Sequence, residues 1–346
     1  MTLARIGRVR AGPLILFVAA AFVLADLVIV FLIGPLDFGF DFTCCYQQAA
    51  ARALKDPSTL YQWSDTYTFR YTPLGALFFA PLVPLSETAA VWAWLVFKVA
   101  LLGVVAWWFT RDWPTDRRAL LGLMVLAFPP AIHDLVLGNV SILTLLVLLA
   151  VERWQDPRGG VAIGLLTVLM PKPYLFPVLA YLAIQRPRDF LASLATIAAG
   201  LAIGLVIFGP DPWLAFADSL REPLGRTFTA NVGFSSLFGP IGVGIGLAVG
   251  AVIVAAGMLV GGSQGYGLSI IGGLAMGPYT FIHYLVGTLV AAEPVLRTRP
   301  RWLVPFPWLL IAFPLIPLWS TGLAAVVRAS PRPPDEEAVP PATAPG

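Results

Sequence analysis

Ionisable side chains stand beside or within long apolar runs of this sequence, where their chemistry would be unusual. Asp41 follows the first apolar run, Lys172 lies between two prolines, and His283 follows a break at Gly277 and Pro278. A carboxylate can accept a proton from a hydroxyl, a lysine can bind an anion, and a histidine can do either near neutral pH. An ionisable group within a membrane is costly unless it faces protein or a water-filled cavity. These residues therefore indicate a polar pocket.

Three breaks carry most of these groups, and each break divides a pair of apolar runs. The breaks span 128–134, 171–173 and 276–283, and the paired runs end in arginine-rich segments. Such segments are typical of cytoplasmic loops, so the breaks should all point to the outer side of the membrane. The polar residues that they bring to this side are His133, Asp134, Asn139, Lys172 and His283.

The composition predicts the class of protein. Apolar residues make up 58% of the 346 residues and charged residues 12%, whereas soluble domains have about 25% charged residues. At roughly 20 residues per crossing, the chain has room for about ten or eleven transmembrane helices. We therefore expect an all-α polytopic membrane protein with a single domain, 1–328, and a disordered proline-rich tail, 329–346. The net charge of +3 is scattered and gives no sign of nucleic acid binding.

The first long polar connection, 35–72, should lie outside the cytoplasm. Three arginines precede the first apolar run, 13–33, which is longer than a signal-peptide core and is expected to stay as an anchor. Within the connection, residues 46–54 favour a helix that stops at Asp56. Its aromatic neighbours favour a position at the membrane surface.

The other predicted crossings are clear except for one stretch. Spans are expected over 190–208, up to residue 260, and over 302–324. Positive charge at both ends of 73–110 allows only an odd number of crossings. Its first part, 73–85, is broken by prolines and either enters the membrane partway or lies at its surface.

Cys44 and Cys45 are the two cysteines of the chain. A bond between neighbouring residues closes a small, strained ring, and two cysteines without histidine support do not make a metal site. We therefore expect both to be unpaired, small apolar side chains.

Several segments together resemble a known family. The stretch from Asp41 to Ala50, then Tyr61, then Phe69 to Leu82, is similar to the first outer loop of glycosyltransferase family 87. This family contains polyprenyl-phosphate-mannose-dependent mannosyltransferases and belongs to the C-type membrane glycosyltransferases. Four later segments also resemble the family's segments and occur in the same order: 137–143, 164–174, 231–237 and 278–284. The resemblance as a whole covers about residues 14–324. The chain departs from the family pattern at Cys45-Tyr46, Asn139 and Phe281.

The resemblance implies a membrane glycosyltransferase of the C-type fold, with surface helices outside the cytoplasm. It implies transfer of a sugar, expected to be mannose, from a polyprenyl-phosphate donor to a glycolipid or glycan acceptor. The reaction would be inverting and independent of metal, would need no cofactor, and would occur on the outer face of a bacterial plasma membrane among membrane lipids. Nucleic acid is not an expected partner.

The resemblance also implies roles for particular residues. Asp41 would be the general base for the acceptor hydroxyl, although an aspartate there could instead cap the following helix. Arg70 and Lys172 would bind the phosphate, and His283 would orient the acceptor or donate to the phosphate. Further substrate-binding candidates are Tyr46, Tyr71, Asn139 and Asp37, and Asp37 is also the competing base. Asp26 and Lys98 are given no role: as charged groups inside apolar runs, they would pair within the bundle or reach toward the interface.

Two other functions stay open at this point. A carrier or flippase for a polar or lipid-linked substrate would show broken helices near the midplane and repeats between the two halves. An inactive scaffold with the same fold would fit the departures from the family pattern. The breaks near one face and the long outer loop favour the enzyme.

Overall fold

The computed structural model describes residues 39–62, 69–126, 128–221, 231 and 233–298. Within these ranges the chain is helical, and the one β-bridge joins Asn231 to Phe281. The all-α fold is therefore confirmed. Several predicted features lie outside the described residues: the run 13–33 with Asp26, Asp37, the span 302–324 and the tail 329–346.

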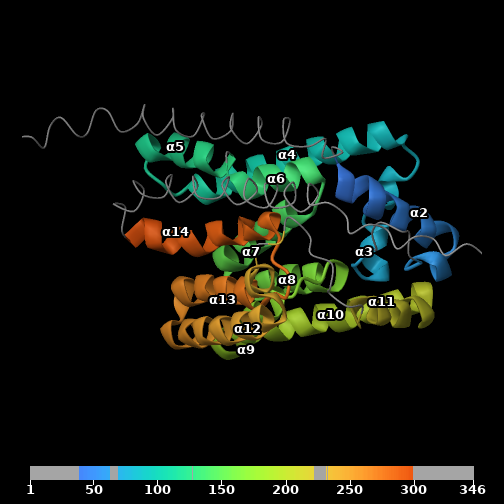
Figure 1. The fold of residues 1–346 in the computed structure, drawn as a ribbon. Coiled ribbons are helices and arrows are strands. Elements are labelled where there is room, and N and C mark those ends of the chain that lie inside the picture. The colour runs from blue at the N-terminus through green and yellow to red at the C-terminus, as the bar shows by residue number, and fades with distance from the viewer. Residues whose placement is uncertain (1–38, 63–68, 127, 222–230, 232, 299–346) are drawn as a thin grey trace, which may run out of the picture.

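The outer loop is built of short helices, as predicted. A π-helix, η2 (Phe42–Gln47), continues directly into α2 (Gln48–Lys55), and the helix ends at Asp56. The Asp56 side chain accepts a hydrogen bond from the Ser58 backbone N–H at 3.1 Å and starts the 3-10 turn η3 (Pro57–Thr59). Figure 1 shows α2 and α3 (Pro73–Leu77) at one end of the bundle together with α11 (Asp211–Arg221).

In the described part of the chain, three helices are long and apolar enough to cross a membrane. They are α4 (Glu87–Thr110), α10 (Pro187–Phe208) and the part Phe238–Val260 of α12 (Phe234–Val260), with mean hydropathies of 2.1, 2.4 and 2.5. Only 11% of the residues in the most apolar part of α10 are buried among the described residues, so much of its apolar surface is left for lipid. The stretch 73–110 therefore holds one helix that is long enough to cross, α4, which follows α3 and the 3-10 turn η4 (Ala80–Leu82).

The three predicted pairs of runs are present as shorter helices. The second pair is α8 (Pro157–Leu169) and α9 (Leu175–Gln185), and the third is α13 (Gly262–Met276) and α14 (Thr288–Thr298), with the 3-10 helix η5 (Ile282–Gly287) between them. At 1.5 Å per residue, the 13 residues of α8 span about 20 Å, less than the hydrocarbon core of roughly 30 Å. The break at Lys172 therefore lies inside the bundle.

The first pair differs from the prediction, which placed a single break over 128–134. The chain turns at Phe128, forms α6 (Pro129–Leu137), turns again at Gly138, and continues as α7 (Ser141–Trp154) after α5 (Thr115–Leu126). Proline in the first turn of a helix costs no backbone hydrogen bond, so the two prolines start a helix here. His133 and Asp134 thus lie on a helix, and Asn139 lies in a turn.

A buried ion pair joins three of these helices. The Lys98 ammonium of α4 lies 2.8 Å from a carboxylate oxygen of Asp134 in α6, and both side chains are buried. The same carboxylate accepts a hydrogen bond from the Ser141 N–H at 2.8 Å, at the start of α7. Lys98 therefore pairs inside the bundle, one of the two outcomes expected for it.

Replacing Lys98 with methionine should destabilise the protein by about 3–5 kcal/mol, because it leaves the Asp134 carboxylate buried without its cation. Thermal unfolding in one chosen detergent measures this. The double variant Lys98→Met with Asp134→Asn should regain much of the loss, since asparagine still accepts from Ser141. Equal losses in the single and double variants would contradict the explanation.

Candidate functional site

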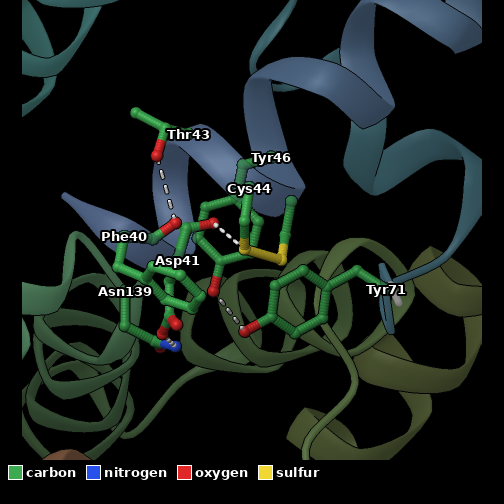
Figure 2. Close-up of a disulfide and its surroundings, with 8 residues drawn as sticks. Phe40, Asp41, Thr43, Cys44, Tyr46, Tyr71 and Asn139 are labelled. Atoms are coloured by element: carbon green, nitrogen blue, oxygen red, sulfur yellow. Dashed lines mark hydrogen bonds between the residues drawn. A yellow bond between two sulfur atoms is a disulfide. The ribbon is translucent and has the colours of Figure 1, made fainter. Parts of the chain in front are cut away.

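The Asp41 side chain does not cap the helix that follows it. Asp41 is the N-cap residue of η2, yet its carboxylate forms no capping hydrogen bond. It accepts instead from the side-chain amide of Asn139, with Asn139 Nδ2 and Asp41 Oδ2 2.7 Å apart (Figure 2). The capping interpretation is therefore wrong, and the carboxylate is directed toward the turn between α6 and α7.

The orientation of the Asn139 amide is fixed by its own neighbours. Its Oδ1 accepts from the Val140 N–H at 2.7 Å and from the Ser141 hydroxyl at 3.3 Å. The oxygen is thus turned to the start of α7, and the NH₂ group is left to donate to Asp41. A rigid turn therefore holds one oxygen of the carboxylate.

Close backbone packing places Asp41 against this turn. Gly39 donates its N–H to the Val136 carbonyl at 2.8 Å, and Trp94 Nε1 donates to the Gly138 carbonyl at 2.7 Å. Gly138 has φ +76°, and a Cβ on it would lie 2.9 Å from Cβ of Phe42. A larger residue at 138 would therefore be strained and would push away the segment that carries Asp41.

The surroundings of Asp41 favour a carboxyl that accepts a proton readily. Burial raises its pKa above the ordinary value for aspartate, and the hydrogen bond from Asn139 opposes this. The Asp134 charge raises the pKa further, whereas the charges of Lys172 and Lys98 lower it. A raised pKa makes a carboxylate a stronger base toward a hydroxyl proton.

A buried lysine is linked to the end of η2 through Tyr71. Lys172 is 1% exposed, and its ammonium donates to the Tyr71 hydroxyl at 3.3 Å. It also lies 4.0 Å from the centre of the Tyr284 ring, a cation–π distance. The Tyr71 hydroxyl is in turn 3.2 Å from that of Tyr46. The ion pairs among the described residues do not include Lys172, so no described carboxylate pairs with it directly.

The residues after Tyr71 explain how it meets Lys172. The Thr72 hydroxyl donates to the Val168 carbonyl at 2.6 Å and accepts from the Gly75 N–H at 3.2 Å. A Cβ on Gly75 would overlap the carbonyl oxygen of Leu169. These contacts fasten α3 to the end of α8, three residues before Lys172.

The two histidines of the chain lie together. The rings of His133 and His283 are nearly parallel, with centroids 5.7 Å apart, and Phe281 stacks on His283 at 5.5 Å. His283 is buried, and neither of its ring nitrogens has a hydrogen-bond partner among the described residues. Its neighbour Tyr284 contacts Lys172. His283 therefore lies on the Lys172 side of the site, and no described contact joins it to Asp41.

The two remaining predicted site residues are Arg70 and Asp37, and no described contact joins Arg70 to Asp41 or Lys172. Arg70 is partly buried, and its charge acts on the phenols of Tyr279 and Tyr284. Asp37 lies outside the described residues. Tyr284, which contacts the Lys172 ammonium, is the site residue that the sequence did not single out.

Hydrogen bonds with Asn231 and Ser235 hold the segment 278–284 in place. Asn231 Oδ1 accepts from the Thr280 N–H at 3.0 Å, and Asn231 Nδ2 donates to Ser235 Oγ at 3.1 Å. The Ser235 hydroxyl donates in turn to the Pro278 carbonyl. The Asn231 segment therefore positions the residues around His283.

Cys44 and Cys45 form a disulfide, which contradicts the expectation of two unpaired side chains (Figure 2). That expectation considered the ring alone and not the backbone around it. The pair lies in the middle of η2, where the π-helical backbone has a wider turn than an α-helix. Both residues are half-buried.

Two cavities in the described part of the chain lie away from these residues. One, of about 210 Å³, is lined by residues such as Glu152, Gln185 and Arg186, and a larger one adjoins it. They lie at the far ends of α7 and α9 from Asn139 and Lys172, and no predicted site residue lines them. Among the described residues, no group of three or more His, Cys, Asp or Glu is arranged to hold a metal ion.

Comparison with known proteins gives one match. The family model of glycosyltransferase family 87 matches residues 69–275. Arg70, Tyr71, Asn139 and Lys172 lie inside the matched range, and Asp41, Tyr46 and His283 lie outside it. No curated protein and no solved structure matches the chain.

Proposed function

The chain belongs to glycosyltransferase family 87 and is a membrane glycosyltransferase, and on that premise we propose that it transfers a sugar from a polyprenyl-phosphate donor. The acceptor is a glycolipid or glycan, the sugar is mannose, and the reaction takes place on the outer face of a bacterial plasma membrane. These assignments rest on the family resemblance and on the arrangement of charges around η2.

The observation that carries the proposal is the position of a carboxylate and a cation beside one short helix. Asp41 is directed to Asn139 at its start, and Tyr46 leads through Tyr71 to Lys172 at its end. Transfer of a glycosyl group from a phosphate needs both a base and a cation.

The proposed chemistry is a single displacement. The acceptor hydroxyl attacks the anomeric carbon while Asp41 takes its proton, and the bond from that carbon to the phosphate oxygen breaks. The sugar inverts its configuration because attack and departure occur on opposite faces. Lys172 and Arg70 stabilise the negative charge that develops on the leaving phosphate, a role that metal ions fill in other transferases.

A transfer assay tests the proposal. Purified protein in liposomes, given polyprenyl-phosphate mannose with a radiolabelled sugar and a bacterial glycolipid extract as acceptor, should form a labelled product in the presence of EDTA. Strong inhibition by EDTA would reject metal independence. Counterflow of the lipid-linked sugar without formation of a product would indicate a carrier instead.

The pH dependence of transfer should reveal the hydrogen bond between Asn139 and Asp41. Asp41 must be deprotonated to act as a base, so kcat/KM should fall as the pH falls through its raised pKa. Replacing Asn139 with alanine removes a bond that favours the charged form, so it should raise that pKa and move the acid limb to higher pH. The exposed amide Gln48 in α2 offers a control, Gln48→Ala, whose acid limb should match the wild type. An unmoved limb in Asn139→Ala would contradict the assignment.

A further inference from the structure

The Cys44–Cys45 disulfide lies between the two functional ends of η2. We propose that this bond sets the positions of Asp41 and Tyr46 and makes sugar transfer depend on the oxidation state of the two cysteines. The part of the inference that concerns transfer rests on the proposed function. The part that concerns the conformation of η2 does not.

The geometry links the bond to both residues. Cys44 Sγ lies 3.8 Å from the Asp41 carbonyl oxygen, one turn earlier in the helix. Tyr46 follows Cys45 directly and reaches Tyr71 with its hydroxyl. Figure 2 shows the disulfide together with the hydrogen bonds that Asp41 and Tyr46 form. A change at 44–45 therefore alters the position of one residue relative to the other.

The disulfide restricts the backbone of η2, which has an uncommon conformation. The π-helix is a rare conformation that occurs mostly as single turns, and η2 occupies six residues. A covalent bond between neighbouring side chains restricts the conformations of the two residues that it joins. When the bond is reduced, the sulfur atoms move apart to a non-bonded separation, and Cys44 and Cys45 regain their rotameric freedom.

The two cysteines are oxidised and reduced by thiol–disulfide exchange with another molecule. On oxidation, the two thiols lose two electrons and two protons to a protein or small-molecule disulfide, which becomes two thiols. An added thiol reverses the reaction through a mixed disulfide. Both cysteines are half-buried rather than enclosed, so an attacking thiol can reach them. The proposed location outside the cytoplasm favours the oxidised form.

The oxidation state can be measured without a transfer assay. In protein isolated with alkylating agent present, the peptide with residues 44 and 45 should carry a disulfide, and alkylation should require prior reduction. The chain has no other cysteine, so the assignment is unambiguous. Alkylation of both thiols without reduction would overturn the proposal.

The effect of the bond is then measured on the same sample. Reduction with a phosphine should lower kcat about tenfold or more, because small misplacements of catalytic groups are costly. It should also speed hydrogen exchange in peptides from 39–55. The variant Cys44→Ser with Cys45→Ser should resemble the reduced wild type in both measurements and should not respond to the phosphine.

The transfer rate and hydrogen exchange together distinguish failure of the proposed function from failure of the inference about the disulfide. A wild-type protein without transfer activity would reject the proposed function, and hydrogen exchange would still test the disulfide. Unchanged exchange on reduction, or unchanged kcat in an active enzyme, would overturn the inference about the bond.

Discussion

Replacing Asp41 with asparagine should lower the rate of sugar transfer by about a hundred- to ten-thousand-fold, the usual contribution of a general base. Asparagine keeps the shape of the side chain and an oxygen that can accept from Asn139, so the loop should stay in place. Asparagine cannot take the proton of the acceptor hydroxyl. The measurement is the initial rate of product formation at saturating donor, compared at equal amounts of inserted protein.

A matched control comes from the same loop. Asp56 is exposed and caps η3, and asparagine caps a helix as well as aspartate does. Asp56→Asn should therefore transfer sugar at the wild-type rate. Full activity in Asp41→Asn would reject Asp41 as the base and leave Asp37 as the candidate.

Replacing Lys172 with methionine should lower kcat by about a hundred- to a thousandfold, the cost of removing one preorganised electrostatic group. The ammonium lies between the Tyr71 hydroxyl and the Tyr284 ring. Methionine fills a similar volume, so the buried position should still be packed. The leaving phosphate loses a cation, and kcat should fall more than donor binding does.

The control for charge alone is Lys55→Met. Lys55 is an exposed lysine at the end of α2, and its loss should leave transfer unchanged. Lys172→Arg should restore only part of the activity, because a planar guanidinium cannot fit the enclosed space of an ammonium. A Lys172→Met variant with normal kcat would show that the lysine serves packing only.

The sequence was informative where physical chemistry acts over short distances. Helix formers and Asp56 gave the extent of α2, and prolines with flanking arginines gave the paired helices. The cost of polar groups in lipid predicted that the breaks would share one region, and Asn139 does meet Asp41 there. That argument needs only the fact that moving a polar group into lipid is unfavourable, and no exact geometry.

Contacts that depend on exact geometry were beyond such reasoning. Tyr284 belongs to the site because its ring faces the Lys172 ammonium, and no local sequence pattern encodes that contact. The partner of Lys98 is one of several acidic residues, and only the packing of α4 on α6 selects Asp134. The disulfide was excluded from ring size, but the π-helical backbone that accommodates it has no recognisable sequence signal.

The apolar outer surface of α10 changes what a stability measurement means for this protein. Only 11% of the residues in its most apolar part are buried among the described residues, so acyl chains are expected to solvate much of the helix. A shorter or more mobile amphiphile alters the free energy of that helix without altering one protein–protein contact. Melting temperatures of variants can therefore be compared only within a single detergent or lipid, because the solvent is a component of the folded state.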